Sequence, residues 1–225
     1  MNSADSCANA SETPRPHLIA IAGPSCAGKT TLAKRLIQTL PEAVHLPLDA
    51  YYKDLSNVAL EQRDRHNFDH PSALDYNLLH TDLQTLANGQ SICAPVYDFH
   101  THTRKSITYP IAPPKYLLIE GLFALYFPAL RALYAYRIYV DVCSNTSLER
   151  RIQRDSIERG RLEDHIRQQF TSQVDPMARR YIIPTRRHAD RVVRGTDSPS
   201  ILCAQIQKAC INLKHRETTE TLPRE

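Results

Sequence analysis

The stretch Gly23-Pro24-Ser25-Cys26-Ala27-Gly28-Lys29-Thr30 fits the pattern G-x-x-x-x-G-K-[ST], and the rest of the chain can be interpreted outward from it. An apolar run, Leu18–Ala22, precedes it, and a segment with helical spacing follows. A strand, a loop and a helix in this order aim several backbone N–H groups at one point, at the positive end of the helix dipole. The loop, extended by Thr31, is therefore predicted to bind the phosphates of a nucleotide, with Lys29 at the β- and γ-phosphates and Thr30 at Mg²⁺.

Segments with strand and helix patterns alternate along the chain. Apolar runs predict strands at 17–22, 43–48, 116–119, 137–142 and 191–193. Helical spacing predicts helices over 29–40, 72–87, 146–158, 162–180 and 199–213, with an interruption at Pro176. The polar segment 92–109 suggests a hairpin-like insertion. This alternation predicts an α/β fold with a central parallel sheet flanked by helices.

Composition limits the class of protein. The chain has 225 residues, 42% of them hydrophobic, which fits one globular domain over 17–215 with loose tails at 1–16 and 216–225. The net charge of +4 suits an anionic small molecule as well as a nucleic acid. Six cysteines without zinc spacing, no secretory signal and no long apolar run predict a cytoplasmic protein with reduced thiols and no membrane contact.

Two acids follow predicted strands directly. Asp49 comes after 43–48, and Glu120 comes after 116–119 and before Gly121. In open α/β sheets, ligands bind at the carboxyl ends of the strands. Phosphoryl transfer needs a carboxylate near the metal and a group that positions the acceptor hydroxyl. Either acid, taken singly, is equally consistent with a solvated strand end, but both face the edge that carries the phosphate loop.

Several further motifs follow in a fixed order. They are Asp49-Ala50-Tyr51-Tyr52-Lys53, Asn67-Phe68-Asp69-His70-Pro71, Tyr97-Asp98-Phe99 with His102 and Arg104, Glu120-Gly121, and Arg151-Ile152-Gln153-Arg154-Asp155 with Glu158-Arg159-Gly160-Arg161. In this order and spacing, from about residue 17 to 195, the chain resembles the uridine–cytidine kinase family. The resemblance implies a P-loop kinase fold with a nucleoside-binding hairpin insertion at about 90–112 and an arginine-rich helical lid at about 144–182.

The resemblance also assigns roles at the reaction centre. Asp49 matches the catalytic aspartate that accepts the proton of the 5′-hydroxyl, and Thr30 and Glu120 match its neighbours around the metal. Asp69 matches a residue that grips the ribose hydroxyls, because a carboxylate can accept two hydrogen bonds from a cis-diol. The alternative for Asp69 is an acid at the start of the helix that follows Pro71.

The base pocket is implied by the same resemblance. Tyr97, Phe99, His102 and Tyr52 match its members. Tyr97 and Phe99 share one face of a strand by their period of two and can form an aromatic wall. His102 has the opposite parity and joins them only if the chain turns after Phe99. Tyr52 is equally consistent with a half-buried aromatic residue.

Arginines dominate the segment from Arg150 to Arg194, which holds twelve arginines and no lysine. The resemblance places four of them in a lid over the transferring phosphate. Arg154 is the catalytic member, Arg159 meets the nucleotide, and Arg151 and Arg161 meet the nucleoside together with Gln169. The remaining members considered are expected on a solvated helix face with local ion pairs: Arg150, Arg167, Arg179 and Arg180.

The implied activity is phosphorylation of uridine or cytidine with ATP or GTP and Mg²⁺, in a homotetramer that binds no nucleic acid. Two alternatives remain: a related kinase for another small alcohol, such as a sugar phosphate or pantothenate, and a nucleotide switch or nucleic-acid-binding ATPase. The chain departs from the family at Pro24 and Cys26, where small residues are commoner, and at 194–197, which is less glycine-rich than usual.

Overall fold

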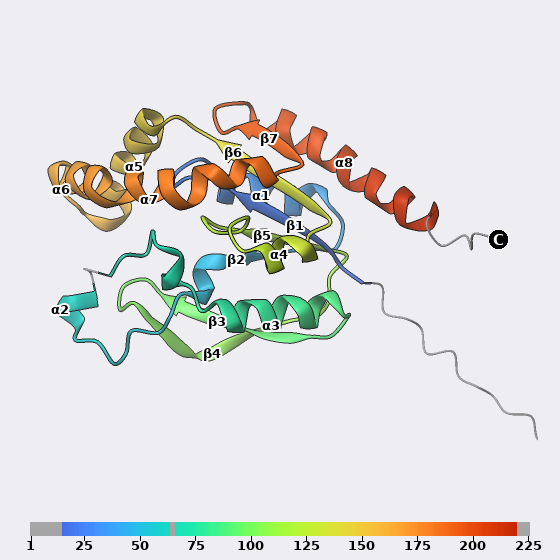
Figure 1. The fold of residues 1–225 in the computed structure, drawn as a ribbon, viewed down its shortest axis with the longest axis horizontal. Coiled ribbons are helices and arrows are strands. Elements are labelled where there is room, and N and C mark those ends of the chain that lie inside the picture. The colour runs from blue at the N-terminus through green and yellow to red at the C-terminus, as the bar shows by residue number, and fades with distance from the viewer. Residues whose placement is uncertain (1–14, 64–65, 220–225) are drawn as a thin grey trace, which may run out of the picture.

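The computed structural model describes residues 15–63 and 66–219 and contains a five-stranded parallel sheet. The strand order is β2-β5-β1-β6-β7. The strands are β1 (His17–Ala22), β2 (Ala43–Pro47), β5 (Tyr116–Glu120), β6 (Tyr136–Asp141) and β7 (Arg191–Arg194). Strand β1 lies at the centre and is buried along its whole length, as expected for a strand covered on both faces. The predicted α/β fold is confirmed (Figure 1).

Helices cover both faces of the sheet. Helices α1 (Lys29–Thr39) and α8 (Pro199–Thr219) pack on one face, where Ile19 and Ile21 meet Leu36 and Ile206 in one apolar cluster. The next residues along β1 point the other way, because successive strand side chains alternate between faces. On that second face Ala20 packs in a cluster that includes α3 (Tyr76–Ala87) and α4 (Pro128–Leu133). Figure 1 shows α8 and α3 on opposite sides of the strands.

The hairpin insertion is present as a separate two-stranded antiparallel sheet. Strands β3 (Ile92–Asp98) and β4 (Thr103–Ile111) pair with a register shift between Pro95 and Tyr97. The buried side chains of the hairpin, Ile92 and Ala94 among them, join the cluster that contains α3. The hairpin therefore extends the core on the α3 side and is not a free arm.

The arginine-bearing helices follow β6 in two runs, which are separated by the non-helical residues 160–162. The first run is α5 (Ser144–Arg159), and the second comprises α6 (Glu163–Gln169), the π-helical η3 (Phe170–Val174), α7 (Asp175–Met177), the π-helical η4 (Ala178–Ile182) and the 3₁₀ turn η5 (Ile183–His188). The prediction that Pro176 interrupts the second run is wrong. Wider π turns flank the proline and keep helical dihedrals on both sides, so the helix absorbs a residue without an N–H.

The start of α3 also differs from the prediction, which began the helix at residue 72. Residues Pro71–Ala73 form the 3₁₀ turn η2, and Leu74 is extended and bridges to Tyr52. Asp75 then caps the helix by accepting a hydrogen bond from the Leu78 amide. The bridge to Tyr52 therefore takes Leu74 off the predicted helical stripe.

Several short elements were not predicted, and the end of α8 differs from the predicted bound. The additional elements are the 3₁₀ turn η1 (Leu48–Tyr51) and the short helices α2 (Leu60–Arg63) and α4. Helix α8 continues to Thr219, so residues 216–219, expected in the C-terminal tail, are helical. The other tail residues, 1–14 and 220–225, lie outside the described residues.

The described cysteines are unpaired, and the described helices do not have the character of membrane spans. Cys26, Cys93, Cys143, Cys203 and Cys210 form no disulfide there, whereas Cys7 lies outside the described part of the chain. None of the helices described combines the length and the apolar character needed to cross a bilayer.

Candidate active site

The loop Gly23–Thr30 joins β1 to α1 at the carboxyl edge of the sheet, as the motif predicted. Its backbone adopts positive φ angles at Gly23 (148°), Cys26 (56°) and Gly28 (100°). A Cβ on Gly23 would lie 2.2 Å from the Val140 carbonyl oxygen, so this close approach requires glycine. Cys26 holds a left-handed conformation without being glycine, which costs backbone strain at the tip of the loop.

The loop after β7, which contains Gly195, packs against the phosphate loop. A Cβ on Gly195 would lie 2.0 Å from the Ala27 carbonyl oxygen, so the two backbones touch. Arg150 donates to the carbonyl oxygens of Cys26 (3.3 Å) and Gly195 (3.0 Å), and the Ser147 hydroxyl donates to the Ser25 carbonyl (2.7 Å). The prediction that Arg150 lies on a solvated face is therefore wrong, because free carbonyls of the two loops attract its guanidinium.

Glu120 is buried beside the start of α1. Its Oε1 accepts a hydrogen bond from the Thr30 hydroxyl at 3.0 Å and lies 3.5 Å from His45 Nε2. Burial raises the pKa of Glu120, but His45, Lys29 and Thr30 outweigh it and bring the pKa below its usual value. Glu120 is therefore ionised at neutral pH and presents a carboxylate next to the Thr30 hydroxyl.

Asp49 is the second residue of η1, two residues after β2 ends at Pro47. Burial raises its pKa to about 6, and the nearby charge of Glu120 adds to this rise, while Lys29 and a hydrogen bond from Tyr52 oppose it. The charges of Glu120 and Asp49 also act on Lys29, whose pKa burial lowers. Lys29 Nζ folds over the loop and donates to the Pro24 carbonyl at 2.8 Å. The two predicted acids and the lysine thus share one buried site.

Aromatic side chains gather on the α3 side of this edge. Tyr52 packs edge-on against Tyr97 (5.6 Å between ring centroids) and against Phe68 (5.1 Å). Phe68 in turn stacks on His102 at 4.7 Å, and Tyr97 packs against Phe99 at 5.3 Å. The four predicted pocket residues are therefore brought together, and Phe68 links His102 to the others.

The position of His102 depends on a turn that the residue parity required. Residues 99–102 form this turn, in which Asp98 Oδ1 accepts a hydrogen bond from the His100 amide (2.9 Å) and His102 takes a positive φ of 53°. Arg104 then fastens the hairpin to η1, donating to the carbonyl oxygens of Tyr52 (3.1 Å) and Tyr51 (3.3 Å). Arg104 thereby sets the distance between the hairpin and the Asp49 segment.

Asp69 lies in the loop before η2 and is 7% exposed. Its Oδ2 accepts a hydrogen bond from Gln173 Nε2 at 3.2 Å, and its charge acts on both Asp49 and Tyr52. Asp69 does not cap a helix, since the His70 imidazole accepts the hydrogen bond from the Ser72 amide instead. The helix-start alternative for Asp69 is thus wrong.

The arginines of α5 converge on Asp155, whose side chain is completely buried. Its carboxylate lies 2.8 Å from Arg154 Nε, 3.4 Å from Arg151 Nε and 3.8 Å from Arg159 Nε. Burial raises the pKa of Asp155, but the arginines, Arg154 foremost, bring it below its usual value. The Asp155 carbonyl oxygen also accepts a hydrogen bond from the amide of Gly160, which ends the helix with a φ of 61°. One residue therefore orients the arginines and terminates their helix.

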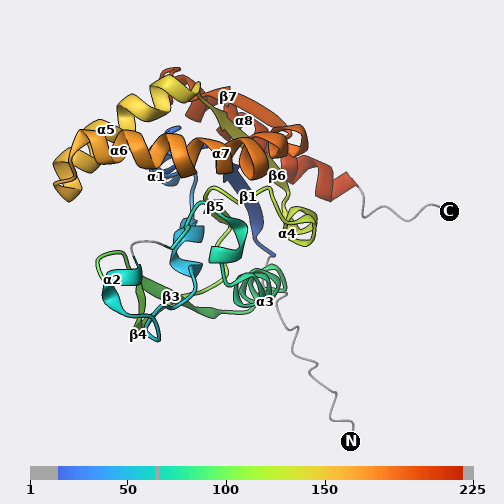
Figure 2. The same cartoon turned by 60° about the vertical axis from the view of Figure 1, so that its left-hand side comes forward.

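Gln169 joins two arginines to the phosphate loop. Its Oε1 accepts from Arg151 (3.3 Å) and Arg161 (3.2 Å), and Arg151 also donates to the Ser25 hydroxyl at 3.2 Å. The solvated positions predicted for three other arginines are confirmed: Arg167 pairs with Glu163, Arg179 pairs with Asp175, and Arg180 lies over the Tyr181 ring. Figure 2 shows α5 to α7 on one side of the strand ends and the hairpin on the other.

Phe68, Asp155 and Gln173 are among the residues at this site that received no role from the sequence. The spacing of Asp155 was a usable signal, because it stands four residues from both Arg151 and Arg159, which places it on their helix face. Phe68 stands beside Asp69 in a motif that had been recognised. Gln173 carried no signal beyond lying four residues after Gln169.

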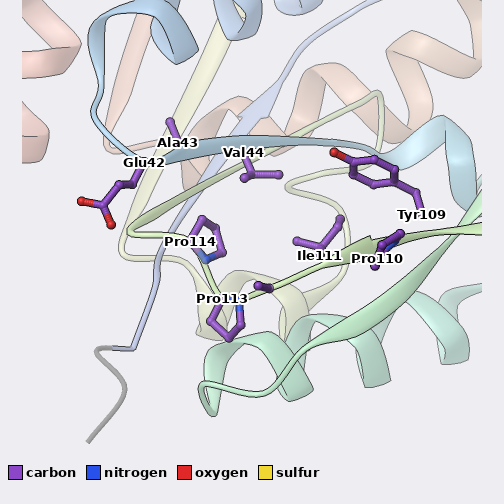
Figure 3. Close-up of a pocket in the computed structure, with 9 residues that line it drawn as sticks. Glu42, Ala43, Val44, Tyr109, Pro110, Ile111, Pro113 and Pro114 are labelled. Atoms are coloured by element: carbon purple, nitrogen blue, oxygen red, sulfur yellow. The ribbon is translucent and has the colours of Figure 1, made fainter. Parts of the chain in front are cut away.

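A hollow of about 410 Å³ lies elsewhere, at the amino end of β2. Figure 3 shows that Glu42, Val44, Tyr109 and Pro114 line it together with neighbouring residues of the same segments. It is on the edge of the sheet opposite the phosphate loop, and among the described residues that line it Glu42 alone is charged. The phosphate loop, Asp49 and Glu120 lie at the other, carboxyl edge of the sheet.

The chain is similar to known sequences over most of its length. The model of the phosphoribulokinase / uridine kinase family matches residues 18–200. A uridine kinase of Halobacterium salinarum is 40% identical over 185 residues, covering 81% of this chain and 82% of the relative. A uridine kinase of Chloroflexus aurantiacus is 39% identical over 182 residues, covering 80% of this chain and 87% of the relative.

A solved structure shares the fold. Phosphoribulokinase from Rhodobacter spheroides superposes with a TM-score of 0.60 at 15% sequence identity, covering 82% of this chain and 74% of that chain. At this identity the likeness concerns the arrangement of the sheet and its helices.

Proposed function

Because this chain belongs to the phosphoribulokinase / uridine kinase family, we propose that it transfers the γ-phosphate of ATP to the 5′-hydroxyl of uridine or cytidine, giving UMP or CMP. The observation that carries the proposal is the shared buried site of Lys29, Asp49 and Glu120, with an aromatic cluster beside it. A phosphate loop alone occurs in many classes of nucleotide-binding protein, but this flanking cluster offers aromatic rings that can pack against a flat base.

Asp49 acts as the base toward the nucleoside. With a pKa of about 6 it is mostly ionised at pH 7.5, yet it is a stronger base than an ordinary aspartate. It orients the 5′-hydroxyl and takes its proton as the oxygen attacks the γ-phosphorus. Lys29 and Arg154 stabilise the negative charge on the transferring group, and Arg159 helps to enclose the nucleotide.

Mg²⁺ is the metal that suits the donors at this edge. Thr30, Glu120 and Asp49 offer oxygen atoms only, and the Thr30 hydroxyl is already 3.0 Å from Glu120 Oε1. The described residues contain no group of three or more His, Cys, Asp and Glu that would form a closed metal cage. This fits Mg²⁺, which takes few protein ligands and binds phosphate oxygens and waters. When bound, it would neutralise charge on the β- and γ-phosphates.

The nucleoside lies between the aromatic cluster and the arginine helices. Asp69 accepts hydrogen bonds from the ribose diol, and Tyr52, Tyr97 and Phe99 form the wall of the base pocket. His102 meets the base edge, and its imidazole offers a donor or an acceptor according to tautomer. Gln169, with Arg151 and Arg161, covers the open side of the pocket.

The finer assignments follow from the same proposal. We propose ATP as the working donor, with GTP as the alternative, and a cytoplasmic homotetramer that binds neither nucleic acid nor membrane. Steady-state assays with each donor and light scattering of the purified protein test these points.

The direct test is purified protein with ATP, Mg²⁺ and uridine, followed by detection of UMP. We expect strong UMP formation by the native chain and a loss of about 10²–10⁴-fold in Asp49→Asn. Asp164→Asn, an exposed acid on α6, is the matched control and should retain activity. Ribulose 5-phosphate and pantothenate serve as competing acceptors. Preference for either of them over uridine and cytidine would refute the substrate assignment.

A further inference from the structure

A π-helical turn connects the arginine helices to the predicted ribose site. Gln173, in η3, donates from Nε2 to Asp69 Oδ2 at 3.2 Å, although the two residues are 104 positions apart. One further contact joins the same segments, between His70 Nε2 and the Tyr181 hydroxyl at 3.0 Å. The loop that carries Asp69 is thus held at two points by the π turns η3 and η4.

The chemistry of the two side chains fixes the orientation of Gln173. An ionised carboxylate only accepts hydrogen bonds, so the amide nitrogen of Gln173 must face Asp69 and its carbonyl oxygen must face away. Among the residues described, that carbonyl oxygen accepts no hydrogen bond. The Asp69 amide is bound by Asn67 Oδ1 at 3.1 Å, so both the backbone and the carboxylate of Asp69 are restrained.

We propose that Gln173 is a specificity-determining residue that lets the enzyme distinguish a ribonucleoside from its 2′-deoxy analogue. This rests on the proposed function, and it adds a residue and a mechanism to it. Gln173 occupies one acceptor position of Oδ2 and stops the Asp69 carboxylate from rotating. The remaining acceptor positions of the carboxylate then face the pair of ribose hydroxyls.

The energetic consequence differs between the two substrates. A site organised for two hydroxyls loses a hydrogen bond and leaves a buried acceptor unpaired when the 2′-hydroxyl is missing. A carboxylate that rotates freely adapts to one hydroxyl as well as to two. Loss of Gln173 should therefore lower turnover of uridine while changing turnover of 2′-deoxyuridine much less.

The test compares kcat/KM for uridine and for 2′-deoxyuridine in the full-length protein with ATP and Mg²⁺. In Gln173→Leu we expect the uridine to deoxyuridine ratio to fall about tenfold. Gln168→Leu is the matched control: the same substitution at an exposed position of α6, with no expected change in the ratio. Tyr181→Phe removes the other contact to the loop and should leave the ratio unchanged.

The outcomes separate this inference from a structural role and from the proposed function. An equal loss for both nucleosides in Gln173→Leu would mean that Gln173 only holds the loop and would overturn the proposal, as would an unchanged ratio. If circular dichroism shows that Gln173→Leu is unfolded, Gln173→Met is used instead, because it keeps the length of the side chain without the amide. The ratio of kcat/KM for uridine to that for 2′-deoxyuridine then decides in the same way. Absence of uridine turnover in the native protein would instead refute the proposed function.

Discussion

The edge proposed to bind phosphate and the side proposed to bind the nucleoside are built differently. The phosphate edge comes from one contiguous loop and two strand ends, and backbone contacts such as those of Gly23 and Gly195 hold it in place. The nucleoside side is assembled from four separate segments, and side-chain contacts such as Phe68 on His102 and Gln173 on Asp69 hold these together. Backbone geometry suits a group that never changes, the phosphate, whereas side chains can adapt a pocket to one substrate.

The largest expected effect tests the claim that backbone contacts determine the phosphate edge. In Gly195→Ala the new Cβ would lie 2.0 Å from the Ala27 carbonyl oxygen, and no side-chain rotation relieves that clash. The phosphate loop must shift, so we expect ATP affinity to fall about 100-fold in isothermal titration calorimetry. Gly160→Ala is the control, because no atom lies within 4 Å of its Cβ, and it should cost only about 1 kcal/mol of stability through its positive φ. Unchanged ATP affinity in Gly195→Ala would contradict the claim.

The next effect concerns the arginines that lie between the two regions. Asp155→Asn removes the buried charge that orients Arg151, Arg154 and Arg159, and leaves their positive charges uncompensated. We expect kcat to fall roughly 30-fold and the free energy of unfolding to fall by about 3 kcal/mol in urea titrations. The uridine dissociation constant should change much less, since the aromatic cluster is intact. A variant with native kcat would show that Asp155 has no positioning role.

A smaller effect is expected from the nucleoside side alone. Phe68→Leu removes the ring that joins His102 to Tyr52, while the phosphate edge is untouched. We expect KM for uridine to rise about tenfold with KM for ATP unchanged, as steady-state kinetics would measure. Phe127→Leu, an aromatic packed against Tyr76 and Tyr126, is the matched control. A parallel rise in both KM values would mean that the two regions are not independent.

The same contrast explains what the sequence could predict. The phosphate loop, the two acids and the five strands follow from local pattern, because a buried parallel strand is a short apolar run and its ligands follow it directly. Arg150 was misplaced because its partners are carbonyl oxygens of Cys26 and Gly195, which no side-chain pattern reveals. The predicted interruption at Pro176 is wrong because π turns accommodate the proline, and π turns have no sequence signature as clear as a proline.

Contacts between distant segments set the remaining limit. Leu74 fits the helical stripe of α3, yet a bridge to Tyr52 keeps it extended. Gln173 meets Asp69 only after the sheet has brought the arginine helices over the loop. Such contacts depend on tertiary packing, so spacing along the chain does not encode them, and the nucleoside side is accordingly the less predictable region.

The smallest expected effect concerns the free energy that folding loses by holding Asp49 charged at the phosphate edge. The folded pKa of Asp49, about 6, lies above its ordinary value of 3.8, so the folded protein binds the proton more tightly and stability falls as pH rises from about 4 to 6. Above pH 6 the charged Asp49 costs about 2 kcal/mol after allowance for its partial exposure. The variant Asp49→Asn should therefore be more stable than the native protein at pH 8.

The measurement is the thermal midpoint of nucleotide-free protein between pH 4 and pH 8. We expect Asp49→Asn to exceed the native value by roughly 5 °C at pH 8 and to approach it near pH 4. Asp54→Asn should show the opposite sign, because a hydrogen bond from Ser56 holds the pKa of Asp54 below its usual value and its charge is favourable. If the thermal midpoint of Asp49→Asn differs from the native value by the same amount at every pH, the difference does not come from the titration of this carboxyl. If Asp49 is the proposed base, its charge is disfavoured in the folded state because the carboxylate is enclosed beside Glu120.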